Sequence, residues 1–126
     1  MPEPLNDRFA RANGFEALER GDGFSKVRAV PGESALNGAD IVHGGYLFSL
    51  ADYAFALASN TDDRLALSAS ASINYIAPCP AGRPVFASAK IVAGAGRGAV
   101  FDITIGDGEG HVYAVFQARA SYRQRQ

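Results

Sequence analysis

One segment constrains the fold of this chain more than any other. From Val42 to Ala58 it reads VHGGYLFSLADYAFALA, and after Gly44 only Asp52 ionises near neutral pH. Apolar residues on every side are typical of a helix that other elements enclose. A carboxylate buried there is costly unless it is paired or hydrogen-bonded, so such a group often has a chemical role. We therefore expect a long buried helix, with Asp52 as its reactive group.

The start of this helix offers a second candidate group. His43 precedes Gly44 and Gly45. The first N–H groups of a helix have no acceptor within it, and they lie at its positive end. We expect both glycines to present bare N–H groups, with Gly44 as the donor of an oxyanion hole.

Before this helix the sequence indicates small elements. Asn6–Ala12 is typical of a short helix capped by Asn6 or Asp7. A hairpin is predicted from Phe15–Arg20 and Phe24–Val30. From Arg64 onward the apolar period is two. It predicts four strands, which are 64–77, 85–92, 99–105 and 111–122. In the first strand it places Leu65, Leu67, Ala69, Ala71, Ile73 and Tyr75 on one face, opposite Ser68, Ser70, Ser72 and Asn74.

These elements predict an α+β fold, with one long central helix on an antiparallel sheet of five to six strands. A chain of 126 residues has room for a single domain, here 1–126. One helix cannot cover such a sheet. The last strand is largely apolar on both faces, so we expect a second subunit to cover the remainder.

Composition excludes several classes of function. With 12 basic and 13 acidic residues the net charge is −1, so we expect neither a nucleic acid nor a membrane as partner. Cys79 is the sole cysteine, which fits a reducing cytoplasm. His43 and His111 lie far apart in the sequence and no metal-ligand spacing occurs, so we expect no metal and no cofactor.

The spacing of the two candidate groups has a geometric consequence. Gly44 and Asp52 are eight residues apart, which is roughly 12 Å along a helix. An oxyanion donor and a base or nucleophile must each lie within about 3 Å of the reacting group, or one water away. If both groups act on one carbonyl, the second must come from a partner subunit. A two-fold dimer would then contain two equivalent sites.

The pattern of Asn37, His43-Gly44-Gly45 and Ser49-Leu50-Ala51-Asp52 resembles the hotdog-fold acyl-CoA thioesterases of the phenylacetate-degradation type. The similarity continues through Ile73-Asn74-Tyr75-Ile76-Ala77-Pro78. It implies a helix wrapped by a curved antiparallel sheet. It also implies dimers with shared active sites, usually paired into homotetramers, and an acyl-CoA substrate.

The same resemblance implies roles for particular residues. It gives Gly44 as the N–H that polarises the thioester carbonyl and His43 as the residue that orients the thioester. Asp52 is the nucleophile or the group that activates water, and Asn37 helps to hold the substrate. Asn6 and Ser68 match positions near the site in some relatives.

Two further residues are candidates for substrate binding. Tyr46 is one of several aromatic residues on the helix that suit an aryl-acyl group, and Arg97 in a glycine-rich turn suits a CoA phosphate. Lys90, Arg119 and Arg123 are alternatives to Arg97.

Structural roles compete with each of these interpretations. Asp52 can be a buried hydrogen-bond acceptor, Asn37 a turn residue and Asn6 a helix cap. Two other functions also fit the chain. One is a hotdog dehydratase or hydratase of acyl thioesters, and the other is an acyl-CoA-binding module without catalysis.

Overall fold

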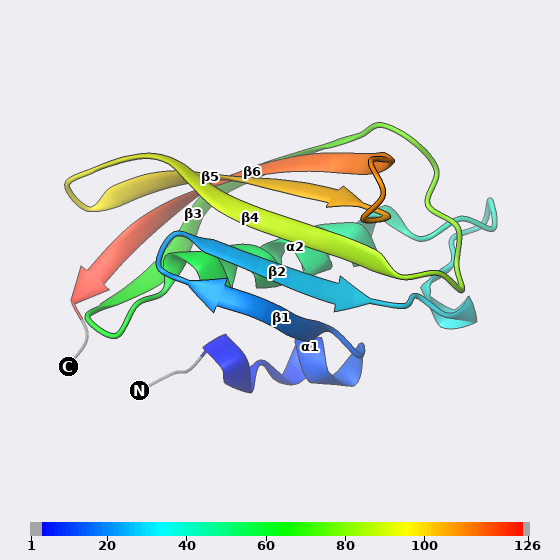
Figure 1. Cartoon of the computed structure of the whole chain (residues 1–126), viewed down its shortest axis with the longest axis horizontal. Coiled ribbons are helices and arrows are strands. Elements are labelled where there is room, and N and C mark those ends of the chain that lie inside the picture. Colours follow the sequence, from blue (N-terminus) through cyan, green and yellow to red (C-terminus); the bar gives the residue numbers. More distant parts are fainter. Residues whose placement is uncertain (1–3, 125–126) are drawn as a thin grey trace.

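The computed structural model describes residues 4–124, and residues 1–3 and 125–126 of the expected domain lie outside that range. A curved sheet wraps one long helix (Figure 1). The helical elements are η1 (Pro4–Asn6), α1 (Arg8–Ala12), η2 (Glu33–Ala35) and α2 (Gly44–Ser59). The strands are β1 (Glu16–Gly21), β2 (Phe24–Ala29), β3 (Arg64–Tyr75), β4 (Val85–Ala95), β5 (Gly98–Gly106) and β6 (Val112–Gln124).

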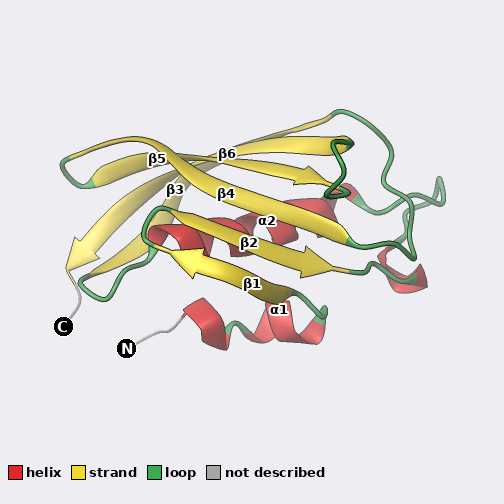
Figure 2. Cartoon of the chain, in the orientation of Figure 1, coloured by secondary structure: helices red, strands yellow, loops and turns green. Residues whose placement is uncertain are grey.

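All six strands belong to one sheet in the order β1-β2-β4-β5-β6-β3, and every neighbouring pair is antiparallel. The strand that follows α2 in the sequence therefore lies at the far edge of the sheet, beside β6. The helix lies across the inner face (Figure 2). The predicted architecture of a central helix on an antiparallel sheet is confirmed.

The core lies between α2 and the inner face of the sheet. Leu50 and Leu57 of α2 are fully buried, as are Phe101 and Ile105 of β5. Burying each such side chain contributes about 1.5–3 kcal/mol. The hydroxyl of Ser25 on β2 also donates to a carbonyl oxygen of α2, that of Ala54, at 2.6 Å. Apolar and polar contacts together hold the helix against the sheet, which fixes the position of its start.

The predicted faces of β3 are wrong on one side of a β-bulge. The register with β6 shifts between Ser68 and Ser70. Ser70 pairs with Arg119 on the outer face, whereas Ser68 pairs with the fully buried Ala120 on the inner face. An extra residue in one strand reverses the alternation beyond it. Ser68 therefore faces the side of the sheet that carries α2, apart from the other serines of β3.

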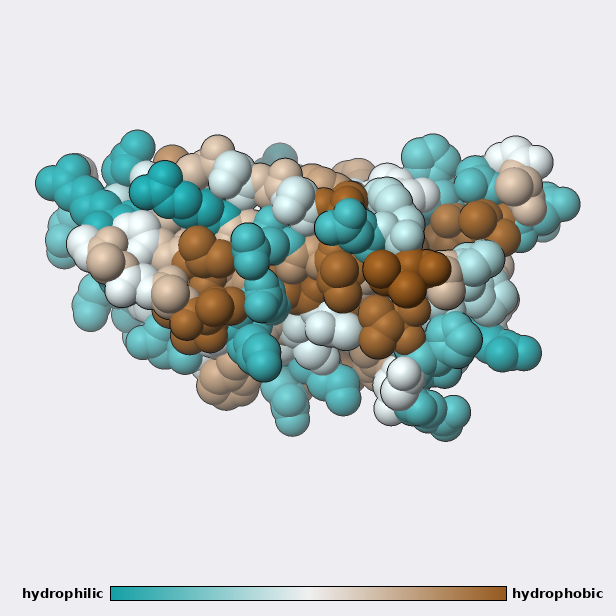
Figure 3. Space-filling model, turned by 90° about the horizontal axis from the view of Figure 1, so that it is seen from above, coloured by the Kyte–Doolittle hydropathy of each residue, from teal (hydrophilic) through white to brown (hydrophobic). Residues whose placement is uncertain are grey.

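Within one chain the outer face of the last strand is open and partly polar, and its covering by a second subunit stays a prediction. Outward-facing residues of β6 include Gln117 and Arg119, and both are exposed. Figure 3 looks down on the side of β5 and β6, where apolar groups lie in separate patches between polar ones. Apolar residues of β6 such as Phe116 alternate with these polar ones and point into the core.

Candidate active site

The first turn of α2 holds the histidine and the glycines identified in the sequence. His43 is the N-cap, and its Nδ1 accepts a hydrogen bond from the N–H of Gly45 at 2.8 Å. An accepting Nδ1 carries no proton, so the neutral imidazole bears its proton on Nε2. The expectation of two bare glycine N–H groups is therefore wrong for Gly45, because His43 occupies it.

The N–H of Gly44 is the exception in this turn. The N–H groups of Tyr46 and Leu47 both donate to the carbonyl oxygen of His43, at 3.0 and 3.3 Å. With Gly45 also occupied, Gly44 is left with the one N–H of the first turn that has no acceptor among residues 4–124. It lies at the positive end of α2, where a partial negative charge is stabilised. This is the local arrangement that an oxyanion donor requires.

Tyr75, at the end of β3, explains why residue 44 is a glycine. Its hydroxyl donates to the carbonyl oxygen of Gly44 at 2.8 Å. A Cβ added at Gly44 would lie 2.8 Å from both Cζ and the hydroxyl oxygen of Tyr75. The sequence did not predict this contact. Alternation along a strand indicates the face on which Tyr75 lies, but not that it contacts Gly44, 31 residues earlier in the chain.

The loop before α2 is held by backbone contacts. The N–H of His43 donates to the carbonyl of Ala35 at 2.7 Å, and that of Val42 to the carbonyl of Cys79 at 2.9 Å. The Asn37 side-chain oxygen accepts from the N–H of Ala39 at 2.8 Å and of Ile41 at 3.3 Å. Asn37 is thus a turn residue, which is the structural role that competes with substrate binding in the sequence analysis. Its amide N–H₂ has no acceptor among residues 4–124, so it can still donate.

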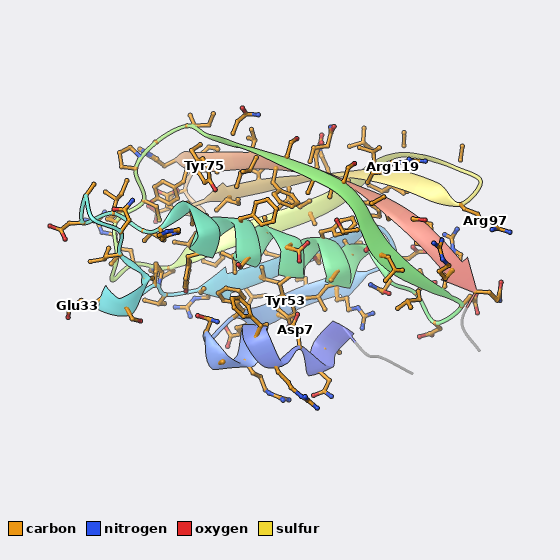
Figure 4. The ribbon with its side chains drawn as sticks, turned by 180° about the vertical axis from the view of Figure 1, so that it is seen from behind. Asp7, Glu33, Tyr53, Tyr75, Arg97 and Arg119 are labelled. Carbon is orange, nitrogen blue, oxygen red and sulfur yellow. The ribbon has the colours of Figure 1, made fainter. Side chains whose placement is uncertain are left out.

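Asp52 is exposed in this chain, contrary to the expectation of a fully buried helix. It lies on a stripe of α2 that the sheet leaves open, which we call the open stripe and define as Gly45, Ser49, Asp52 and Ala56. These residues are exposed or half-buried. Seen from behind, α2 lies in front of the sheet between α1 and β3 (Figure 4). The helix is therefore covered on most sides but not on the side of the carboxylate.

The surroundings of Asp52 still favour its protonated form. Loss of solvation by the surrounding protein raises the pKa of its carboxyl group, and the negative charge of Asp7 raises it further. Asp7 is the N-cap of α1, with a carboxylate oxygen that accepts from the N–H of Ala10 at 2.9 Å. Asp7 lies beside Tyr53 of α2 (Figure 4). The pKa of Tyr53 is raised mainly by burial and further by the charge of Asp7. The N-cap of α1 is thus close enough to Asp52 to act on its charge.

The remaining predicted residues lie in different places. Asn6 precedes Asp7 and accepts from the Arg11 guanidinium at 2.9 Å. Tyr46 is half-buried against Phe15, with ring centroids 5.3 Å apart. Arg97 lies in the turn between β4 and β5, at the opposite end of the molecule from Tyr75 (Figure 4). One chain therefore does not bring Arg97 to the start of α2.

Gly44 and Asp52 are not brought together within one chain either. Both lie in the continuous helix α2, two turns apart. The spacing of roughly 12 Å predicted from the sequence therefore holds. Among residues 4–124, no group of three or more His, Cys, Asp or Glu side chains is placed to hold a metal ion.

The outer face of the sheet carries a separate groove. It has a volume of about 350 Å³, and its lining includes Ser72, Asn74, Asp102, Thr104 and Gln117. Gln117 donates to Asp102 there at 2.9 Å. The sheet stands between this groove and α2, so the groove does not belong to the site at the helix.

Comparison with known proteins identifies the family. A family model described as the thioesterase superfamily matches residues 39–114, which include His43, Gly44 and Asp52. The chain belongs to the thioesterase superfamily. Its sheet wrapped around one helix is the hotdog fold of that family, and the resemblance to thioesterases of the phenylacetate-degradation type is confirmed.

Individual relatives agree with this assignment. The acyl-coenzyme A thioesterase PaaI of Escherichia coli is 33% identical over 91% of this chain and 82% of its own length. Its solved structure superposes with a TM-score of 0.89 over 94% of this chain and 86% of its own, at 32% identity. A mutant of the phenylacetic acid degradation protein PaaI from Thermus thermophilus gives 0.87, at 34% identity, over 93% of this chain and 99% of its own.

A further relative matches a shorter region. A protein of Archaeoglobus fulgidus named as a putative esterase is 42% identical over 69% of this chain. The match spans 56% of that relative's length. In the described part of this chain, no helix combines the length and apolarity needed to cross a membrane.

Proposed function

We propose that this protein hydrolyses an aryl-acyl-CoA thioester to the free acid and CoA, at two sites that two copies of the chain form together. The unoccupied N–H of Gly44 at the positive end of α2 carries this proposal. Membership of the thioesterase superfamily and similarity to an acyl-coenzyme A thioesterase support the reaction class. The association of these two relatives with phenylacetic acid degradation supports an aryl-acyl group.

The thioester carbonyl oxygen would accept from the N–H of Gly44. As the carbonyl carbon becomes tetrahedral, negative charge collects on that oxygen, and a fixed donor at a helix start stabilises it. The Nε2–H of His43 and the free amide N–H₂ of Asn37 would orient the thioester from the same end of α2. These three donors fix the substrate but supply no nucleophile.

Asp52 of a second copy would supply the nucleophile or the base. As a base, its carboxylate takes a proton from water while the water oxygen bonds to the carbonyl carbon. The C–S bond then breaks and the CoA thiolate receives that proton. As a nucleophile, it forms a mixed anhydride and expels the thiolate, and water then cleaves the anhydride. Both routes require Asp52 in its ionised form.

The open stripe of α2 and the free edge of β3 support a two-fold dimer. Small or polar residues leave α2 accessible between β3 and α1, and β3 has a partner strand on one side only. An antiparallel second copy on this stripe would bring its Asp52 toward Gly44 of the first. Pairing of such dimers would give a tetramer.

Other substrate contacts belong to the same proposal. Ser68, just before the bulge, lies on the face of the sheet that carries α2. Asn6 lies next to Asp7, whose charge reaches Asp52. Tyr46 would bound the acyl end. Arg97 could meet a CoA phosphate only at a site built with a second copy. We also propose the cytoplasm as the location, since the one thiol, Cys79, is buried and free.

Hydrolysis of a small acyl-CoA panel by wild type and by Asp52→Asn tests the function. The panel contains phenylacetyl-, hydroxyphenylacetyl-, benzoyl-, short-chain and long-chain acyl-CoA, with free CoA measured by a thiol reagent. We expect turnover of an aryl-acyl-CoA by wild type and none by Asp52→Asn. The variant should keep the fold, because the amide occupies the same space. Asp102→Asn on the outer face is the matched control and should retain full activity.

Three outcomes contradict the proposal. Near-normal turnover by Asp52→Asn removes Asp52 from the mechanism. Formation of an enoyl product, seen by its ultraviolet absorbance, identifies a dehydratase or hydratase instead. Tight acyl-CoA binding with no turnover of any panel member identifies a binding module.

A further inference from the structure

We propose that Tyr75 is a positioning residue for the active site, acting through the peptide group between Gly44 and Gly45. This inference rests on the proposed function. It adds to that function a residue on another element that holds the oxyanion donor and the histidine in place together. Tyr75 comes from β3 and is half-exposed, at 53%.

The peptide group between Gly44 and Gly45 is held at both ends. Its carbonyl oxygen accepts from the Tyr75 hydroxyl at 2.8 Å. Its N–H donates to Nδ1 of His43 at 2.8 Å. A peptide group is planar and rigid, so the two bonds together fix its tilt about the axis of the chain. Tyr75 therefore acts on His43 through one intervening group.

The hydrogen bonds form a continuous chain from the hydroxyl to the imidazole. Hydrogen bonds in series polarise one another, so donation by Tyr75 to the carbonyl strengthens the bond from Gly45 to Nδ1. That bond holds the imidazole in the form with its proton on Nε2. Nε2 is then the one ring nitrogen of His43 that can donate to a substrate.

The ring of Tyr75 has a second effect on the oxyanion donor. It lies so close to the α-carbon of Gly44 that a Cβ there would meet the ring at 2.8 Å. The N–H of Gly44 belongs to the peptide group on the other side of this α-carbon. With the following peptide fixed and one side of the α-carbon covered by a ring, the direction of that N–H is restricted. An oxyanion donor acts only if it is aimed before the reaction.

The ring and the hydroxyl of Tyr75 can be separated by substitution. Tyr75 is exposed enough that a phenylalanine would fill the same position over Gly44 without burying a polar group. Among residues 4–124, the hydroxyl of Tyr75 makes one hydrogen bond, to the carbonyl oxygen of Gly44. Tyr75→Phe therefore removes that bond and keeps the ring.

Steady-state kinetics of Tyr75→Phe test the proposal. We expect kcat to fall about tenfold with KM unchanged, because misaimed groups lose transition-state contacts before they lose substrate binding. Tyr122→Phe removes a hydroxyl from another strand, far from the start of α2, and is the matched control. It should leave kcat unchanged. An unchanged kcat in Tyr75→Phe overturns the proposal.

Nitrogen-15 NMR of the histidines gives a readout that a role in stability alone would not change. The chain has two histidines, so His111 serves as an internal reference. In Tyr75→Phe we expect the Nδ1 and Nε2 resonances of His43 to shift toward a mixture of tautomers while those of His111 stay constant. A fall in kcat with unchanged His43 resonances and a lower melting temperature identifies a structural role and overturns the proposal.

These measurements also separate this inference from the proposed function. If wild type hydrolyses no acyl-CoA, the function fails, yet the His43 resonances still report whether Tyr75 holds the imidazole. If wild type is active, Asp52→Asn is inactive and Tyr75→Phe matches wild type, the function stands and the role of Tyr75 fails.

Discussion

Among the residues of the candidate site, Gly44 has a steric requirement of its own. Glycine in a helix is less favourable than alanine by about 1 kcal/mol, so at an unconstrained position alanine stabilises. At residue 44 the ring and hydroxyl of Tyr75 occupy the space of a Cβ. The backbone N–H is still present in any variant except proline. A substitution here therefore tests the placement of the donor and not its existence.

We expect Gly44→Ala to lower kcat by about 100-fold, because Tyr75 must move and the donor loses its aim. The free energy of unfolding should change little, because the displaced ring belongs to an exposed side chain and alanine is favoured over glycine in a helix. Activity assays and chemical denaturation measure the two effects. Gly32→Ala is the control, since no atom lies within 4 Å of a Cβ at Gly32. Wild-type kcat in Gly44→Ala would contradict this account of the site.

At the scale of elements, the open side of α2 is bordered by the end of β3 and the cap of α1. The start of α2 supplies His43 and Gly44, the end of β3 supplies Tyr75, and the cap of α1 supplies Asp7. The hydrogen bond from Tyr75 and the charge of Asp7 act on different ends of the same stripe. α1 therefore contributes an electrostatic effect in addition to packing.

The charge of Asp7 leads to a pH-dependent prediction. The proposed reaction requires Asp52 in its ionised form. Burial, followed by the negative charge of Asp7, raises the pKa of this carboxyl group. Activity should therefore fall as the pH drops through this raised pKa. In Asp7→Asn we expect this acidic limb to move to lower pH, because the repulsion is removed. Asparagine caps a helix as well as aspartate does, so α1 should persist.

The profile of kcat against pH measures this shift, and Asp40→Asn in the loop before α2 is the control. A limb that does not move in Asp7→Asn would contradict the coupling. The sign for stability is opposite to that for activity. Folded Asp52 keeps its proton to higher pH than the unfolded chain does. Its contribution therefore favours folding at low pH and is lost as the pH rises through the raised pKa.

At the scale of the whole molecule, the open stripe and the edge of β3 remain uncovered in one chain. β3 exposes Leu67 and Tyr75, and the residue after it, Ile76, is also exposed, at 62%. An exposed strand edge with apolar side chains is a surface on which a second chain can pair. In the proposed reaction Gly44 and Asp52 act together, and their separation by two turns on one helix also requires a second chain. Assembly and activity should therefore be lost together.

Ala56→Arg tests this connection. Ala56 lies on the open stripe one turn beyond Asp52, so a long charged side chain there should block a second copy while the chain itself still folds. We expect wild type to sediment as a dimer or tetramer, and Ala56→Arg to sediment as a monomer and to lose turnover. Ser88→Arg, which alters the outer face of β4, is the control for added charge. An active monomer of Ala56→Arg would refute the shared site.

The sequence by itself determined the elements and the candidate groups, because these depend on local patterns. Apolar residues all round a helix, a period of two in four strands, and the spacing of Gly44 and Asp52 are all local properties. The first two led to the confirmed fold. The spacing of Gly44 and Asp52 on one continuous helix led to the expectation that a second chain completes the active site, which stays a prediction.

Only the tertiary structure decided how those groups are presented. The bulge in β3 moved Ser68 to the inner face, which a regular alternation cannot predict. The open stripe exposed Asp52, since the curvature of the sheet sets what it covers. The contact of Tyr75 with Gly44 joins residues 31 positions apart. The His43 cap, in turn, leaves only the N–H of Gly44 in the first turn without an acceptor among residues 4–124. Such contacts depend on how distant elements pack, which a local pattern does not record.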